Sequence, residues 1–345
     1  MLHNMGADRQ DRSFHGNLRD LRIKDSEITA MDIAAHSIDP DDERKEIAEF
    51  LSDFSIEVTP KAAAKIEDFR SMLRPGASVY ITFLAGSDFN DTIALAERLR
   101  REGFNPVPHI AARSSPSYAF VEDALRKLKD RADVEQVLLI GGAGPQIGEY
   151  SDTMQLLETG LFDRFGIERI GIAGHPEGSP DISDAAIRNA LAWKNDFARR
   201  SGARLHIVTQ FCFEAEPIIA WDRRIRSEGN LLPIHIGVPG LATIKTLAAH
   251  ARACGVGPSA RFIFKQALNV AKLLTVSTPA KLIADLARYR ATDPECGISN
   301  VHLFPLGGVQ KTADWANAVI GEGLDLERSR GFRADIERRE RAAAQ

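Results

Sequence analysis

The feature that most constrains the fold of this chain is a repeated alternation of short apolar segments with amphipathic helical patterns. Apolar segments of this length indicate buried strands, and the helical patterns between them indicate parallel strands covered by helices. Eight such segments favour closure of the sheet into a barrel. They are FSIEV (54–58), VYITFL (79–84), NPVPHI (105–110), QVLLIGG (136–142), RIGIAG (169–174), HIVTQF (206–211), PIHIGV (233–238) and SNVHLFPL (299–306). We therefore predict an α/β protein with a (β/α)8 TIM barrel.

The competing architecture is an open, doubly wound sheet. Such a sheet normally carries a glycine-rich phosphate turn with G-x-G-x-x-G spacing after an early strand. No turn of this kind follows the first three segments. Residues Gly141 to Gly144 follow the fourth segment, but they lead into Pro145 rather than directly into a helix. The pattern favours the barrel.

The barrel is predicted to occupy residues 51–325. Residues 1–50 form an N-terminal extension that is partly helical, because Asp39 can cap a helix whose first position is Pro40. Residues 326–345 form a charged C-terminal tail, which we expect to be helical or frayed.

Amphipathic patterns between the strand segments predict the helices of the barrel. The pattern at 61–74 predicts a helix after the first strand. Two further patterns, at about 259–274 and 278–291, predict extra helices before the last strand. The regular alternation is therefore expected to break after the seventh strand.

Composition narrows the classes of partner. A formal net charge of -4 gives no electrostatic case for nucleic acid or for an anionic membrane. The sequence contains no apolar run that approaches a membrane span, and its N-terminus lacks the hydrophobic segment of a signal peptide. Cys212, Cys254 and Cys296 are too few and too scattered for a disulfide framework or a zinc site. We expect a cytoplasmic protein that binds neither nucleic acid nor membrane.

The first strand carries one acid, Glu57, inside an apolar alternation. Ile56 and Val58 share one face at period two, which places Ser55 and Glu57 on the other. In a barrel strand that second face points into the lumen near the mouth, where neighbouring groups dehydrate a carboxylate. The pKa of Glu57 should then rise, and Glu57 could donate a proton near neutral pH. The alternative is a solvated or ion-paired glutamate at the end of a strand.

Polar residues also follow the other strands at their carboxyl ends, where barrel enzymes build their active sites. None of the acids and histidines has metal-ligand spacing, so no metal centre is expected. His109 and His302 each lie in an apolar strand, where a buried structural histidine is the alternative to a ligand-binding one. The group comprises Thr82, Ser87, His109, Gly141 to Gly144, His175, Glu177, Ser179, Gln210, Gly237, Gly240 and His302.

Asn195 and Arg199 lie four residues apart in the helical pattern that precedes the sixth strand. At this spacing both side chains project from one face of a helix. An amide and a guanidinium together suit a phosphate or a ribityl chain. A solvated helix face is the alternative.

Seven segments, taken in order across residues 54–306, resemble the catalytic barrel of methylenetetrahydrofolate reductases. The strand FSIEVTPK resembles the family's opening strand with its acid, and IVTQFCFEAE closely resembles its I-T-Q-F-F-F-D segment. The other five are VYITFLAGS, VPHIAARS, IGIAGHPEGSPD, PIHIGVPGLATI and VHLFPLGG. No single segment is strongly diagnostic, but their common order is.

This resemblance implies an enzyme that reduces 5,10-methylenetetrahydrofolate to 5-methyltetrahydrofolate through bound FAD, with NADH or NADPH as the reductant. Glu57 matches the acid that protonates N10 of the folate and so opens the five-membered ring to a 5-iminium ion. The matched substrate-binding positions are Gln210, Phe211 and Phe213, and the matched cofactor-binding positions are Thr82, His109, Gly142, Ala143, His175, Asn195 and Arg199. A homo-oligomer is the family's default.

The chain departs from the family in the segments that contact flavin. Ile140 to Ala143 stand where the family has L-R-G-D, and His175 and Ser179 replace a tyrosine and a histidine. Losing a charged hydrogen bond costs about 1.5–3 kcal/mol, so two such losses would weaken flavin binding roughly a hundredfold or more. Three hypotheses therefore stand: an FAD-dependent reductase, a flavin-poor or flavin-independent folate-linked oxidoreductase of one-carbon catabolism, and a folate-binding protein without turnover.

Overall fold

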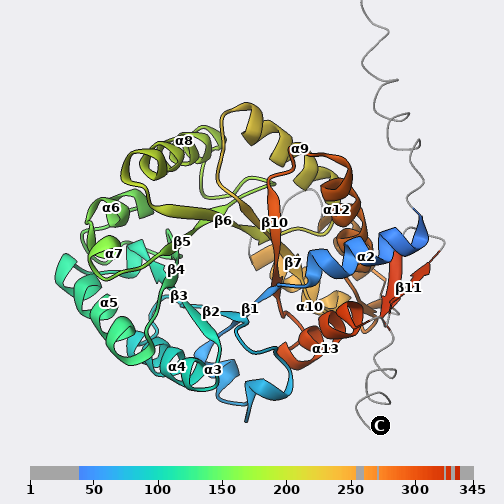
Figure 1. The fold of residues 1–345 in the computed structure, drawn as a ribbon, viewed down its shortest axis with the longest axis horizontal. Helices are drawn as coiled ribbons and strands as arrows, with labels where there is room; N and C mark the ends of the chain where they lie inside the picture. Colours follow the sequence, from blue (N-terminus) through green and yellow to red (C-terminus); the bar gives the residue numbers. More distant parts are fainter. Residues whose placement is uncertain (1–38, 254–259, 270–271, 322–323, 328–330, 335–345) are drawn as a thin grey trace, which may run out of the picture. The chain divides into compact units, whose positions relative to one another are not determined.

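The computed structural model describes residues 39–253, 260–269, 272–321, 324–327 and 331–334. Parallel strands close into a barrel in the order β1-β10-β7-β6-β5-β4-β3-β2, with helices around the outside (Figure 1). The strands are β1 (Ser55–Val58), β2 (Ser78–Ile81), β3 (Asn105–Ala111), β4 (Gln136–Ile140), β5 (Arg169–Gly174), β6 (Arg204–Phe211), β7 (Ile234–Pro239) and β10 (Ile298–Phe304). Each predicted apolar segment contains or overlaps one of these strands, so the predicted TIM barrel is confirmed.

The two faces of each strand bury different side chains. On β1, Ile56 and Val58 pack into the main core between the strands and the helices. Ser55 and Glu57 face the lumen, where both contact His302 of β10. The predicted division of the first strand is therefore confirmed.

Helices pack on the outer surface of the barrel (Figure 1). Four of them begin after a Ser or Asp whose side chain accepts a hydrogen bond from the first turn: Asp88, Ser117, Asp152 and Ser183. The helices are α2 (Pro40–Leu51), α4 (Phe89–Arg101), α5 (Tyr118–Ala132), α6 (Thr153–Glu158), α7 (Leu161–Arg164), α8 (Asp184–Ser201), α9 (Ala215–Ser227), α10 (Ile244–Ala253), α11 (Arg261–Ala267), α12 (Ala280–Thr292) and α13 (Val309–Ile320). No described helix is both long and apolar enough to cross a bilayer.

Helix α2 begins at Pro40, as predicted, but it packs as part of the barrel unit rather than outside it. Its apolar residues Ile47, Phe50 and Leu51 are buried in the main core. The compact unit that contains the barrel accordingly begins at Pro40.

The helix predicted at 61–74 does not form, and this prediction was wrong. The segment contains only the single turn α3 (Pro60–Ala63) and a short 3-10 turn, η1 (Phe69–Ser71). Arg98 of α4 donates hydrogen bonds to the backbone oxygens of Ala63, Ile66 and Glu67. The Ala63 oxygen also accepts from the Ile66 N–H, so the chain makes a tight turn here and its carbonyl groups are held by a tertiary contact with α4.

The insertion before the last strand and the tail after it both differ in detail from prediction. The helix expected at 259–274 is shorter, because α11 ends at Ala267 and the chain then pairs β9 (Val276–Ser277) with β8 (Ala242–Thr243). The described part of the tail is not helical. It contributes β12 (Gly331–Ala334), which pairs antiparallel with β11 (Leu324–Glu327).

Candidate functional site

Glu57 sits at the mouth end of β1 with its carboxylate enclosed by side chains from β3, from β10 and from the residue that follows β2. Its exposed fraction is 9%. The Thr82 hydroxyl, just after β2, donates a hydrogen bond to Oε1 at 2.5 Å. His302 Nε2 on β10 lies 3.4 Å from Oε2, and His109 Nε2 on β3 lies 3.9 Å from Oε1. One acid, two imidazoles and one hydroxyl therefore form a single polar group in the lumen.

The prediction that the pKa of Glu57 is raised was wrong. Burial does oppose ionisation, as the sequence argument expected. The hydrogen bond from His302, the nearby histidine charges and the Thr82 hydroxyl together outweigh it and lower the pKa of Glu57 to about 2. Glu57 is consequently ionised at neutral pH, and any proton that it donates must reach it from another group.

His109 stands beside Glu57 without a hydrogen-bond partner of its own. Its Nε2 atom is buried and makes no hydrogen bond among the described residues. Burial lowers the pKa of His109 to about 4, although the Glu57 charge opposes the change. His109 is therefore a neutral imidazole at neutral pH, available to hydrogen bond with a ligand at the mouth.

An aromatic wall continues from this polar group along the mouth. Phe211 is 1% exposed and packs against Phe213 and Phe304, with ring centroids 5.7 and 5.3 Å away. Phe213 and Phe304 are only partly buried, so Phe211 supports the wall and its two neighbours form the accessible surface. Gln210 is also partly exposed at the end of β6. Sequence reasoning missed Phe304, although it lies two residues after His302 in the same strand.

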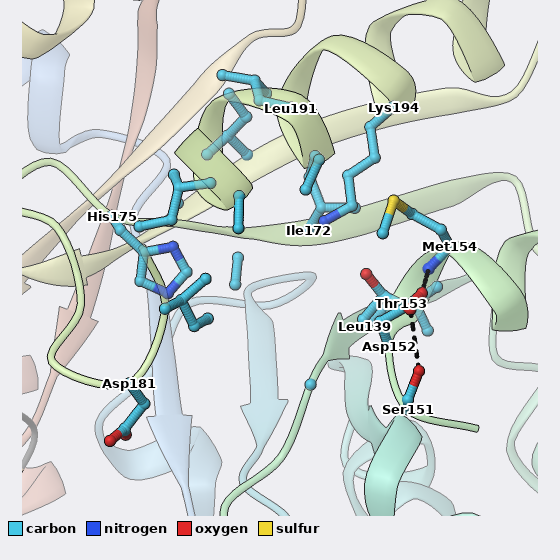
Figure 2. Close-up of a pocket in the computed structure, with 18 of the residues that line it drawn as sticks. Leu139, Ser151, Asp152, Thr153, Met154, Ile172, His175, Asp181, Leu191 and Lys194 are labelled. Carbon is cyan, nitrogen blue, oxygen red and sulfur yellow. Dashed lines mark hydrogen bonds between the residues drawn. The ribbon is translucent and has the colours of Figure 1, made fainter. Parts of the chain in front are cut away.

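A cavity of about 300 Å³ lies on the outer side of β4, β5 and β6, beneath α8 (Figure 2). Leu139, Ile172 and Ile207 form its apolar floor. None of the residues around Glu57 lines this cavity, so the structure has two distinct candidate sites. The volume is at the low end of the range for ligand pockets.

Lys194 is the unusual residue of this cavity. It is the only described residue of α8 that is fully buried, and Figure 2 shows its side chain extending from the helix into the cavity. Burial lowers the pKa of Lys194 to about 8, and the charge of Asp152 only partly compensates. Lys194 makes no hydrogen bond or ion pair within the described parts of the chain. An ammonium group held this way favours an anionic ligand.

The predicted cofactor pair Asn195 and Arg199 lies neither in the lining of the cavity nor in the group around Glu57, so its cofactor role stays a prediction. Asn195 hydrogen bonds to Asn230 and to the backbone of Leu231, in the loop that enters the amino end of β7. Arg199 is exposed and pairs with Asp196 at 2.5 Å. The spacing indicated a shared face, but the inward residue of this helix is the neighbouring Lys194.

Of the other matched cofactor positions, three lie at the two sites and two lie in the loop after β4. Thr82 and His109 belong to the group around Glu57. His175 lines the cavity, where burial lowers its pKa. Gly142 and Ala143 lie in the loop after β4, and Gly142 has a φ of 86° and space too small for a side chain, because an added Cβ would lie 3.0 Å from Ala111 Cβ.

The residues present fit a phosphorylated cofactor in part. Lys194 provides an unpaired cation, and Gly141, which begins the loop after β4, also lines the cavity. Arg113, which also lines the cavity, already donates hydrogen bonds to the backbone oxygens of Gly142 and Ser151. Among the described residues, no three His, Cys, Asp or Glu side chains converge as a metal site would require.

No known protein-family profile matches this chain. Over 173 residues the chain is 24% identical to methylenetetrahydrofolate reductase 2 of Saccharomyces cerevisiae. The match covers 47% of this chain and 27% of the yeast protein, so the chain spans about a quarter of that relative's length. A solved structure of a protein from Clostridium thermocellum, which binds two copies of 5-methyl-5,6,7,8-tetrahydrofolic acid, superposes with a TM-score of 0.53. That likeness has 13% identity and covers 79% of this chain and 95% of the other.

Proposed function

We propose, from the relationship of this chain to the methylenetetrahydrofolate reductase family, that it reduces 5,10-methylenetetrahydrofolate to 5-methyltetrahydrofolate. The observation that carries the proposal is the buried Glu57 carboxylate at the mouth of the lumen, held by Thr82 and His302. An acid in this position can protonate N10 of a folate bound at the mouth. Protonation of N10 breaks its bond to the methylene bridge and leaves a 5-iminium ion.

Groups beside Glu57 suit the rest of a folate. Gln210 offers an amide to the hydrogen-bonding edge of the pterin. Phe213 and Phe304 offer partly exposed rings against which a flat heterocycle can pack. Neutral His109 can hydrogen bond to the substrate without adding a positive charge near N10. The mouth therefore combines a proton-transfer group with an aromatic surface.

We propose that the cavity beneath α8 holds only the phosphate-bearing part of a cofactor, whose hydride-donating ring would have to lie at the mouth. Lys194 would hold a phosphate there, and His175, which follows β5, lines another part of the same cavity. When bound, FAD would supply the hydride that reduces the iminium carbon, after its own reduction by NADH or NADPH. The absence of charged side chains at Gly142 and Ala143 equally supports a reductase that takes its hydride directly from the nicotinamide cofactor.

A folate-binding protein without turnover is the second candidate. The low pKa of Glu57 favours it, because an ionised carboxylate cannot donate a proton by itself. The Clostridium thermocellum protein also supports it, since its structure holds 5-methyltetrahydrofolic acid.

The deciding experiment combines a visible absorption spectrum of the purified protein with an assay for 5-methyltetrahydrofolate. Yellow protein that bleaches with NADH or NADPH and recovers its colour with 5,10-methylenetetrahydrofolate supports the FAD-dependent reductase. Colourless protein that forms the same product supports direct hydride transfer. Tight binding of 5-methyltetrahydrofolate, with no product from either reductant with or without added FAD, would refute the reductase and favour the binding protein.

A further inference from the structure

We propose that exposed cations in the segment between β7 and α12 bind the carboxylates of a folate's glutamyl tail. The inference rests on the proposed function, because it takes the folate rings to pack along the aromatic wall beside Glu57. It adds a specificity that the proposed reaction does not require. Affinity should rise with the number of γ-linked glutamates, since each one adds a carboxylate. We call residues 240–279 the cationic segment.

The cationic segment reverses the charge balance of the chain. Residues 229–284 contain no Asp or Glu, although the whole sequence holds 48 acidic residues against 44 Lys and Arg. None of the cations in the segment forms an ion pair within the described parts of the chain. All of them are exposed, and they are Lys245, Arg252, Arg261, Lys265 and Lys272. The segment therefore presents positive charge that no described acidic side chain neutralises.

The described parts of the segment lie at the mouth of the barrel. The strands of the barrel are parallel, so β7 ends at Pro239 on the side where Glu57 lies. Helix α12 then returns from Ala280 toward the opposite end, where β10 begins. A backbone hydrogen bond of 3.1 Å from the Lys245 N–H to the Leu273 oxygen joins the start of α10 to the last part of the segment. The cations are therefore at the same end of the barrel as Glu57.

The segment also extends the aromatic wall of the candidate site. Phe264 of α11 and Phe213 of the wall pack against the same buried residues, which are Phe211, Ala251 and Ala260. Phe264 is itself only partly buried. The aromatic surface therefore continues from the end of β6 onto α11.

Arg252 lies at the far end of this aromatic surface. Its guanidinium carbon is 5.6 Å from the centre of the Phe264 ring, within the range of a cation–π contact. A guanidinium held in this way can bind a carboxylate through two parallel hydrogen bonds. At the other end of the surface, the His302 ring lies 4.9 Å from that of Phe304, and its Nε2 atom lies 3.4 Å from the Glu57 carboxylate. The proton-transfer group and the guanidinium thus lie at opposite ends of one aromatic wall.

This order of groups matches the order of the parts of a folate. A pterin that reacts at Glu57 continues through an aminobenzoyl ring into a glutamate, so the ring would lie along the wall and the first carboxylates would meet Arg252. Further glutamates would reach Arg261 and Lys265, which lie four residues apart and project from one face of α11. Each of these exposed pairings would strengthen binding about twofold to fivefold, and salt would screen it.

The test compares monoglutamyl with pentaglutamyl 5-methyltetrahydrofolate by calorimetry on the full-length protein. We expect the wild type to bind the longer form about tenfold more tightly at about 50 mM salt, and this preference to shrink at about 500 mM salt. A triple variant with Arg252→Gln, Arg261→Gln and Lys265→Gln should bind the two forms within about twofold of each other. Equal affinities in the wild type, or an unchanged preference in the triple variant, would overturn the proposal.

Arg101→Gln is the matched control. Arg101 is an exposed arginine in the last turn of α4, which runs from the mouth to the opposite end of the barrel. This variant should keep the wild-type preference for the longer tail. The side chains replaced in the triple variant are exposed as well, so its urea unfolding midpoint should equal that of the wild type.

Turnover and vesicle binding separate this inference from its alternatives. Tail-dependent binding by a protein that forms no 5-methyltetrahydrofolate would refute the reductase and still support the tail site. Product formation with equal affinity for both tail lengths would support the reductase and refute the tail site. Binding of phosphatidylserine vesicles through the same cations, with no effect of tail length on folate affinity, would assign the segment to an anionic surface and overturn the proposal.

Discussion

Replacing Lys194 by methionine should stabilise the protein against unfolding at neutral pH. Methionine has a similar length and fills the same space, but it removes a charge that Asp152 compensates only in part. The pKa of Lys194 is about 8 instead of 10.5, and about 1.4 kcal/mol per pH unit converts this difference to about 3 kcal/mol. Wild type bears this cost at pH 7, where the amine is protonated in both the folded and the unfolded state.

The sign of the pH dependence follows from the same pKa. Between pH 8 and 10.5 the unfolded chain binds a proton at Lys194 that the folded protein has released, so wild-type stability should rise with pH in this window. Urea unfolding at pH 7 should therefore show Lys194→Met more stable by about 3 kcal/mol, and the difference should shrink by pH 10. Lys65→Met, at an exposed lysine, is the control and should change stability by less than about 0.5 kcal/mol. A variant equal to or less stable than wild type at pH 7 would refute the reasoning.

Two further predictions concern the titration of His109 and the role of Asn195. As pH drops from 6.5 to 4, His109 should lower the unfolding free energy of the wild type by about 3 kcal/mol, because the unfolded state binds a proton that the buried ring does not bind. In urea titrations of His109→Gln, the decrease over this pH range should be smaller by that amount. An equal decrease in the variant and the wild type would contradict the pKa assigned to His109. Asn195→Ala should lower stability by about 1–3 kcal/mol, because Asn230 and Leu231 lose their hydrogen-bond partner. Its affinity for FAD or NADH, measured by fluorescence titration, should stay at the wild-type value, whereas a large loss would return Asn195 to the cofactor site.

The barrel could be predicted from sequence because each strand can be recognised from the pattern of its own residues. Their period-two alternation places Ile56 and Val58 in the core and leaves Glu57 for the lumen, whatever the rest of the chain does. The helix at 61–74 could not be judged in this way. Its carbonyl groups are bound by Arg98, more than thirty residues away in the sequence, and no local pattern records that contact.

The chemistry of the site was less predictable, because it also depends on contacts between residues that are far apart in the sequence. The ionisation of Glu57 depends on His302, which lies 245 positions further along the chain and pairs with β1 only after the barrel closes. On α8, helical spacing grouped Asn195 with Arg199 but could not tell which face turns toward the strands. The residue that faces the strands is Lys194, although lysine side chains are usually exposed to solvent.

The most direct test of the account is the formation of 5-methyltetrahydrofolate by wild type and by Glu57→Gln, with folate affinity measured in parallel by calorimetry. Glutamine keeps the shape of the carboxyl group and can still hydrogen bond to Thr82, but it cannot protonate N10. We predict product from the wild type, no detectable product from the variant, and folate affinities of the same order for both. Equal turnover in the two proteins would contradict the role of Glu57, and with it the central claim.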